Sequence, residues 1–439
     1  MDISIDSETR SAVELVRSIG REYLRPLGIE ADRSNRPIPA DHPFYTMVAR
    51  SGYMQQGLGG DGAKRARGHA EDHKSAGASP MDGGSEGVKP TGTRAARGSS
   101  AVRNVLVAEE GSYWDRGAMV SLPGPGLGGP PVQRMGTPEQ RERFLAPFRQ
   151  REHPVWAAFA MTEPGAGSDV ARIATRAVRD GDEWVLTGQK MYSSNSPRAE
   201  WVVVFATTDP ALGRAGHRAF VVERGTPGFE ILRVEHKMGL RAYETATFAL
   251  DACRVPDGNL LGGDEYYEGS ARRGFEGAMS AFNATRPVVA AMAVGIARCA
   301  LDLAVEVVRD DYPVQGLSRR RRALERRAVA RQGVEVARLL CLRAAWMMDK
   351  GEPNALAASM AKQYAPPAAL AAVEAAAAVL GEAGVLQGSL VEKLARDVKA
   401  MDIVEGTQQI QRRVIARHVI GALGTSTEQS STEQSSTEQ

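Results

Sequence analysis

The chain has 439 residues, enough for about three domains of ordinary size, and its hydrophobic fraction of 43% is normal for a protein that buries a large core. With 55 basic and 53 acidic residues, its net charge of +2 argues against a chain-wide adaptation to nucleic acid. The three cysteines, Cys253, Cys299 and Cys341, stand far apart and the seven histidines are scattered, so we expect no metal site and a reduced, cytoplasmic environment.

The sequence contains no segment that predicts export or membrane insertion. Its N-terminus is acidic at once and lacks the basic and apolar regions of a signal or transit peptide. We identify no apolar stretch of membrane-spanning length. The sequence therefore predicts a protein without a leader peptide and without a transmembrane helix.

Residues 1–150 are predicted to form a helical domain that contains an insertion. Apolar residues recur at helical spacing over four segments, 9–25, 44–54, 102–110 and 138–150. Pro26 should end or kink the first of these helices. Residues 57–100 contain almost no large apolar side chains, so we expect disorder there, because ordering this segment would lose entropy without burying surface. A basic loop that binds a partner is the less favoured interpretation.

Three further regions follow along the chain. In residues 151–265, β-branched and aromatic residues alternate between turn pairs such as Asp-Gly and Pro-Gly, which predicts a compact antiparallel β domain. Residues 266–422 return to a helical pattern, and their alanine-rich stretches are typical of closely packed helices. Residues 423–439 repeat Thr-Glu-Gln within serine-rich sequence and have nothing to bury, so we expect a disordered tail.

A lone carboxylate near the C-terminus is the first candidate for catalysis. Glu405 follows apolar Ile403 and Val404 and precedes flexible Gly406 and Thr407. Apolar surroundings disfavour the charged form of a carboxylate and raise its pKa, which suits a general base near neutral pH. On spacing alone, a surface residue at the start of a helix remains the favoured interpretation.

A glycine-rich turn forms the second candidate. The run from Phe159 to Asp169 leaves an apolar segment and passes through Pro-Gly-Ala-Gly-Ser. Glycines let the backbone approach a ligand closely, and the hydroxyl groups of Thr162 and Ser168 add hydrogen-bond donors. Alone, this run is also compatible with an ordinary loop.

Together and in this order, the two runs closely resemble the acyl-CoA dehydrogenase family of FAD-dependent flavoproteins. Further matching segments are 122–131, 135–140, 184–195, 225–229, 238–241 and 282–287, the last being similar to the start of the family's long helix beside the thioester. The resemblance covers roughly residues 1–55 and 100–422. It implies an α+β fold with an N-terminal helical domain, a middle antiparallel β-barrel domain that binds flavin and a C-terminal four-helix bundle. The insertion at 57–100 replaces a segment that lines the substrate pocket in relatives.

The resemblance also implies the reaction. A member of this family oxidises the Cα–Cβ bond of an acyl-CoA to a trans-2-enoyl-CoA and passes a hydride to the flavin. Glu405 would then be the base that removes the α-proton, and the Glu405–Gly406 peptide would hold the thioester oxygen as charge develops on it. We expect loss of the carboxylate to slow the reaction by several orders of magnitude.

Site residues follow from the same resemblance. Flavin contacts are implied for Phe159, Met161, Thr162, Gly167, Ser168, Tyr192, Ser194, Arg309, Thr407 and Gln409. Substrate contacts are implied for Ser168, Asn283, Arg286 and Gly406. Tyr192 and Ser194 replace a family Trp and Thr, and Asn283 replaces an Asp. For two of these residues an interpretation without a binding role remains open. Tyr192 could be an aromatic residue in the core of a strand, and Arg286 could be a solvated arginine on a helix face.

Two departures from the family concern the flavin phosphates. Relatives carry Arg-x-x-Phe-Gly and then a glutamine that reaches the phosphates of a neighbouring subunit, whereas here only Arg309 matches. The arginine run 319–327 could bind the pyrophosphate, although such runs are usually solvated. Where the family has Gly-Gly-x-Gly, residues 381–384 of this chain are Gly-Glu-Ala-Gly. The carboxylate of Glu382 would repel phosphate. Flavin affinity and contacts between subunits are therefore open.

The resemblance implies partners as well as chemistry. We expect an acyl-CoA substrate, an electron-transfer flavoprotein as acceptor, and a homotetramer or homodimer. Two alternatives stay open at this point. One is a flavin oxidase or monooxygenase of the same fold, and the presence of Glu405 argues against the monooxygenase. The other is a catalytically degenerate subunit that pairs with an active partner.

Overall fold

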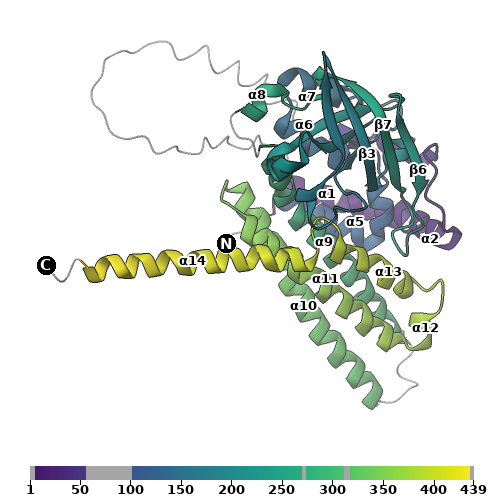
Figure 1. The fold of residues 1–439 in the computed structure, drawn as a ribbon. Coiled ribbons are helices and arrows are strands. Elements are labelled where there is room, and N and C mark those ends of the chain that lie inside the picture. Colours follow the sequence, from purple (N-terminus) through teal and green to yellow (C-terminus); the bar gives the residue numbers. More distant parts are fainter. Residues whose placement is uncertain (1–4, 56–100, 269–272, 311–316, 436–439) are drawn as a thin grey trace, which may run out of the picture.

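The computed structural model describes residues 5–55, 101–268, 273–310 and 317–435 (Figure 1). Helices come first, a curled sheet follows, and long helices complete the chain, so the predicted α+β order of helical, β and helical parts is confirmed. The predicted insertion at 57–100 lies outside the described residues.

The N-terminal part of the described chain is helical. Its α-helices are α1 (Ser7–Ile19), α2 (Arg25–Ser34), α3 (Pro43–Arg50), α5 (Ala101–Val120), α6 (Gly129–Met135) and α7 (Pro138–Leu145). Helices α1 and α2 pack against α5. Pro26 neither ends nor sharply breaks the helical path, because one π-helical turn over Gly20–Leu24 leads directly into α2 and Pro26 stands in its first turn.

The middle of the chain forms one seven-stranded sheet. Its strands are β1 (Ala157–Ala160), β2 (Arg176–Asp180), β3 (Glu183–Ser194), β4 (Trp201–Thr207), β5 (His217–Glu223), β6 (Phe229–Val234) and β7 (Thr245–Pro256). The order is β1-β4-β2-β3-β7-β6, with β5 also paired to β4. The sheet is mainly antiparallel, as predicted, and the exceptions are β1 and the start of β2, which both pair in parallel with β4. Strand β4 is buried along its whole length, which explains its continuous apolar sequence.

The C-terminal part is a bundle of long helices. Its elements are α8 (Gly263–Glu268), α9 (Arg273–Asp310), α10 (Leu317–Asp349), α11 (Ala355–Leu380), α12 (Glu382–Val385), α13 (Leu390–Ile403) and α14 (Gln408–Ser435). Helix α11 packs against α9, α10 and α13, and its buried alanines allow close approach. Helix α9 begins at Arg273, earlier than the predicted start at 282–287, so Pro287 lies inside it.

Helix α14 extends into the predicted C-terminal tail. It continues through Ser435, and Figure 1 shows its last turns standing away from the rest of the protein. Residues 425–435 contain neither glycine nor proline, the two residue types that most strongly oppose a helix.

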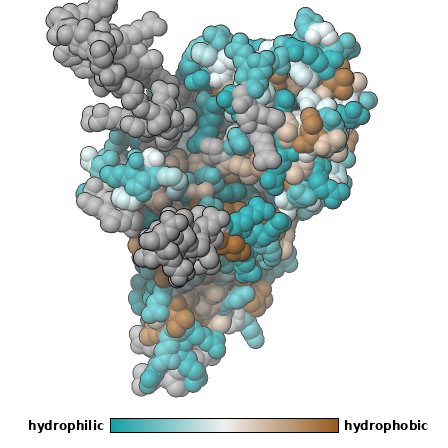
Figure 2. Space-filling view, turned by 60° about the vertical axis from the view of Figure 1, so that its left-hand side comes forward, coloured by the Kyte–Doolittle hydropathy of each residue, from teal (hydrophilic) through white to brown (hydrophobic). Residues whose placement is uncertain are grey.

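Within the described ranges, one helix is long and apolar enough to span a membrane, which the sequence analysis missed. This segment, Arg273–Glu306, lies in α9, and 67% of its apolar window is buried inside the protein. Such burial is expected of the central helix of a bundle. On the face drawn in Figure 2, hydrophobic side chains are scattered among hydrophilic ones.

Candidate active site

A strained loop joins α13 to α14 and contains the candidate base. Glu405 and Gly406 adopt φ angles of 55° and 96°, both in the left-handed region. For a residue with a side chain this conformation costs about 1–3 kcal/mol and persists where the surroundings enforce it. Lys362 Nζ and Gln411 Nε2 each donate to the carbonyl oxygen of Gly406 at 3.2 Å. A Cβ atom on Gly406 would lie 2.5 Å from Gln411 Nε2, so the loop requires glycine there.

The carboxyl group of Glu405 is held by a helix from another part of the bundle. Thr285 Oγ1, on α9, donates to Glu405 Oε2 at 2.6 Å. Burial raises the pKa of Glu405, against the opposing effects of the Thr285 hydrogen bond and of the positive charges on Lys362, Arg116 and Arg286. The net shift is upward, so the group binds a proton more readily than an ordinary surface carboxylate.

The same stretch of α9 also contacts the sheet. Phe282 precedes Thr285 by three residues, about one helical turn. Its ring packs edge-on against that of Phe159 in β1, with 5.9 Å between the ring centroids. Helix α9 therefore contacts both the strand that enters the glycine-rich turn and the loop that contains Glu405.

A buried ion pair fixes the base of the glycine-rich turn. Lys190 Nζ lies 2.6 Å from Glu163 Oε1, and the two side chains are 0% and 5% exposed. Lys190 also donates to the carbonyl oxygen of Met161 at 3.2 Å, and Glu163 accepts from the backbone of Thr175. Burial lowers the pKa of Lys190 to about 8, although Glu163 favours its charged form. The pair ties β3 to the turn and is absent from the sequence-based site.

The tip of that turn is open to solvent. Backbone and side-chain bonds to β3 hold its entry, since Met191 N donates to Thr162 O and Ser193 Oγ donates to Phe159 O, each at 2.9 Å. Gly167 and Ser168 are exposed. A ligand can therefore approach the backbone of the turn without displacing protein atoms.

Tyr192 is not a core aromatic. It stands at an irregularity of β3 with φ of 58°, and 61% of the residue is exposed. Ser194 is half-buried at the end of the same strand, opposite Thr245. After the Glu405 loop, Thr407 is half-buried at the start of α14 and Gln409 is exposed.

Arg286 is not a solvated arginine. The residue is 6% exposed, its Nη1 donates to Asn283 Oδ1 at 2.7 Å, and its Nε has no hydrogen-bond partner among the described residues. Burial lowers the pKa of Arg286. The carbonyl oxygen of Asn283, which Pro287 cannot bond because proline lacks an N–H, accepts from Asn354 Nδ2 at 3.2 Å. Asn283 and Arg286 are thus fixed beside the Glu405 loop.

Arg309 lies far from this loop within a single chain. It follows Arg286 by 23 residues on α9, a rise of about 34 Å, and its side chain is exposed. In the arginine run, Arg321 pairs with Glu325 and both side chains are exposed. The side chains of residues 319 and 320 lie outside the described residues.

The sequence analysis missed Lys362, Arg116 and the contact of Thr285 with Glu405. Lys362 interrupts an alanine-rich face, and its helical neighbours Ala358 and Ala365 are buried. A lone lysine at such spacing signals a buried charge. Arg116 follows the break in α5 at Asp115 and offers no comparable signal.

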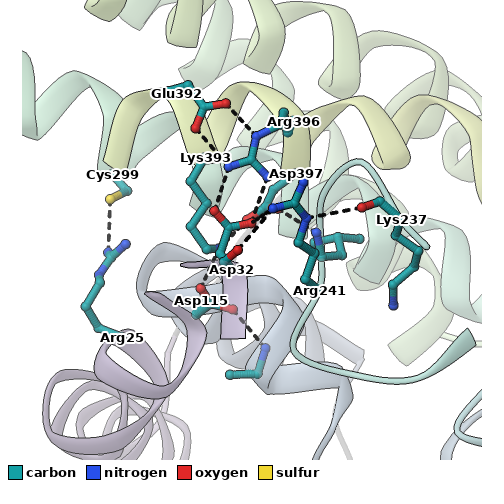
Figure 3. A network of polar contacts seen from close by, with 12 residues as sticks. Arg25, Asp32, Asp115, Lys237, Arg241, Cys299, Glu392, Lys393, Arg396 and Asp397 are labelled. Atoms are coloured by element: carbon teal, nitrogen blue, oxygen red, sulfur yellow. Dashed lines mark hydrogen bonds and ion pairs between the residues drawn. The ribbon is translucent and has the colours of Figure 1, made fainter. Parts of the chain in front are cut away.

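An ionic network fixes the helix that leads into the Glu405 loop (Figure 3). Lys393 of α13 contacts Asp115 of α5 at 2.7 Å and Asp397 at 2.5 Å. Asp397 also accepts from the backbone of Leu240 at 2.6 Å. Arg396, which follows Lys393 by three residues on α13, pairs with Asp32 of α2 at 2.6 Å. Helices α2, α5 and α13 and the loop at 237–241 are thereby joined just before the chain reaches Glu405.

The family models and the similar proteins named below agree on one family. The model of the acyl-CoA dehydrogenase middle domain matches residues 158–253, and that of the C-terminal domain matches residues 272–420. Cyclohexane-1-carbonyl-CoA dehydrogenase of Geobacter metallireducens is 39% identical over 67% of this chain and 75% of its own length.

Two solved structures superpose over nearly the whole chain. Butyryl-CoA dehydrogenase from Megasphaera elsdenii has a TM-score of 0.79 and 27% identity, covering 96% of this chain and 100% of its own. A structure described as an electron transferring flavoprotein of Acidaminococcus fermentans has a TM-score of 0.76 and 28% identity, covering 95% and 99%. The chain belongs to the acyl-CoA dehydrogenase family of FAD-dependent enzymes.

Proposed function

We propose that this enzyme dehydrogenates an acyl-CoA thioester between Cα and Cβ to give the trans-2-enoyl-CoA, with Glu405 as the base. The observation that carries the proposal is the position of the Glu405 carboxyl group, which accepts a hydrogen bond from Thr285 at 2.6 Å in a loop held by Lys362. Its surroundings raise its pKa, which is the direction that suits a general base. Family membership supports acyl-CoA dehydrogenation in general.

The α-proton of a thioester is a weak acid, so its removal requires stabilisation of the carbonyl oxygen as well as a base. The loop offers a donor for this purpose. Within the part of the chain that the structure describes, the amide N–H of Glu405 donates to no acceptor. In the proposed mechanism this N–H binds the thioester oxygen while the carboxylate of the same residue takes the proton.

The residues around the site fit FAD. An exposed aromatic ring at Tyr192, the open turn with Ser168 and the hydroxyl of Thr407 can contact the flavin, which when bound accepts the hydride that leaves Cβ. The unpaired, buried Nε of Arg286 provides a donor near the thioester. Glu382, the carboxylate that departs from the family pattern, is exposed to water, which weakens its repulsion of phosphate.

We also propose a second copy of the chain and a protein electron acceptor. Arg309 is remote from Glu405 within one chain, so it could contact the flavin phosphates only from a neighbouring subunit, as the family resemblance implies. A homodimer or homotetramer satisfies this requirement. Reoxidation by an electron-transfer flavoprotein in the cytoplasm follows from the same resemblance.

The proposal predicts reduction of bound flavin by acyl-CoA. Anaerobic addition of saturated acyl-CoA thioesters of increasing chain length to the FAD-loaded enzyme should bleach its visible absorbance, and mass and retention time should identify the trans-2-enoyl-CoA. No bleaching with any chain length would contradict the proposal. Rapid reoxidation in air with peroxide release would favour an oxidase of the same fold.

A further inference from the structure

Lys362 is a buried charge beside the candidate base. It lies on α11 and is 0% exposed, between the buried alanines 358, 361 and 365. Its ammonium group donates to the carbonyl oxygen of Gly406 at 3.2 Å. Within the described part of the chain it forms no ion pair by contact. A buried cation without a paired anion is strongly unfavourable, so its retention at this position calls for an explanation.

The charges that face Lys362 come from α13, from the loop that follows it and from α9. Asp402, at the end of α13, and Glu405 favour its protonated form, whereas Arg286 of α9 opposes it. Burial is the largest effect and lowers the pKa of Lys362 to about 8. Glu405 in turn is faced by Lys362, by Arg286 and Thr285 of α9, and by Arg116 of α5.

The hydrogen bond of Lys362 reaches the strained part of the loop. Gly406 O is the acceptor, and the peptide that leads into Gly406 begins at Glu405, whose φ is 55°. Gln411, also fully buried, donates to the same oxygen. Two side chains that cannot move far therefore fix the orientation of the Glu405–Gly406 segment.

We propose that Lys362 is a positioning residue for the reaction: its ammonium group holds the Glu405–Gly406 turn and supplies the nearby positive charge that keeps the Glu405 carboxylate available, a role that rests on Glu405 being the base. It touches neither the substrate nor the flavin in this scheme. Because Lys362 and Glu405 are close charges of opposite sign, their titrations are coupled.

The coupling predicts the pH dependence of the limiting rate of flavin reduction by acyl-CoA. The rate rises with pH as Glu405 loses its proton. It falls above a pH of about 8, because Lys362 then loses its charge and no longer holds the carbonyl oxygen of Gly406 as an ammonium donor. In Lys362→Met the falling limb disappears. The rising limb moves to higher pH, because loss of a neighbouring cation raises the pKa of a carboxylate. The maximal rate drops about 10-fold or more, since the loop is no longer fixed.

The variant Lys362→Arg tests whether the falling limb comes from loss of the proton on Lys362, because it keeps the positive charge at this position. Arginine keeps the positive charge but does not lose it in this pH range, so the falling limb should vanish while the rising limb stays near its wild-type position. Lys350→Met, a matched change at an exposed lysine that directly follows α10, should keep both limbs. A falling limb that persists in Lys362→Arg, or a folded Lys362→Met with both limbs unmoved, overturns the proposal. If Lys362→Met does not fold, the wild-type and arginine profiles still decide.

A second measurement does not depend on turnover. With lysine labelled at Cε with ¹³C, the NMR resonance that is lost in Lys362→Arg should titrate near pH 8 in the wild type. In Glu405→Gln its pKa should fall, because the negative charge that favours the ammonium form is gone. An unshifted lysine resonance in Glu405→Gln contradicts the coupling. Failure of acyl-CoA to bleach the flavin would contradict only the proposed function.

Discussion

The hydroxyl group of Thr285 makes the shortest contact to the candidate base, donating to Glu405 Oε2 at 2.6 Å. A hydrogen bond to the charged form of a carboxylate lowers its pKa, and bonds to charged groups contribute about 1.5–3 kcal/mol. Thr285→Val keeps the shape of the side chain and removes the donor. We expect the rising limb of the pH–rate profile to move up by about one unit.

Thr285→Ser is the matched control, because it keeps the hydroxyl and loses only a methyl group. Its rising limb should stay close to that of the wild type. Stopped-flow reduction of the flavin by acyl-CoA across a pH series provides the measurement. A valine variant with an unchanged rising limb would mean that Thr285 does not set the proton affinity of Glu405.

Some features of the site follow from neighbouring residues and others do not. The apolar residues before Glu405 and the glycine after it are visible in the sequence, and they give the direction of the pKa shift. The hydroxyl at position 285 and the lysine at position 362 reach Glu405 only through the packing of α9 and α11. The exposure of Tyr192 was also not predictable, because it depends on a local irregularity of β3 that the alternation of residues along the strand does not reveal.

At the scale of elements, α13 is held by buried charges rather than by apolar packing alone. Lys393, 4% exposed, lies between the carboxylates of Asp115 and Asp397. Lys393→Met leaves two buried carboxylates without their cation. Breaking such an arrangement costs about 3–5 kcal/mol, so we expect a large drop in the denaturant midpoint of the FAD-loaded enzyme.

Lys393→Met combined with Asp115→Asn tests the cause of this loss. Removing one of the two orphaned charges should recover part of the stability, because a neutral amide is less costly to bury than an unpaired carboxylate. If the double variant is no more stable than Lys393→Met, the loss comes from packing and not from unpaired charge.

Helix and strand types were predictable from periodicity, whereas their connections were not. The helical spacing in 9–25 is correct, yet a π-helical turn carries the chain past Pro26. Alternation indicates the strands of the sheet, yet it does not indicate that β1 pairs in parallel with β4. The polar end of α14, residues 425–435, contains no glycine or proline.

At the scale of the whole molecule, three segments far apart in the sequence meet around one helical turn of α9. Phe159 from the sheet contacts Phe282, and Glu405 from the end of the bundle contacts Thr285. No local pattern in the sequence indicates this meeting. Arg309 stays remote from it within one chain, so under the proposed function this residue reaches the flavin phosphates only from a second copy of the chain.

The central claim is that the carboxylate of Glu405 removes the α-proton, and the rate of flavin reduction in Glu405→Gln tests it most directly. Anaerobic mixing with saturating acyl-CoA should show a rate about 10²–10⁴-fold or more below that of the wild type, with flavin content unchanged. Glu374→Gln, on the exposed face of α11, should react at the wild-type rate. A folded, flavin-loaded Glu405→Gln that reduces its flavin within tenfold of the wild-type rate, about 1.4 kcal/mol, would contradict the account.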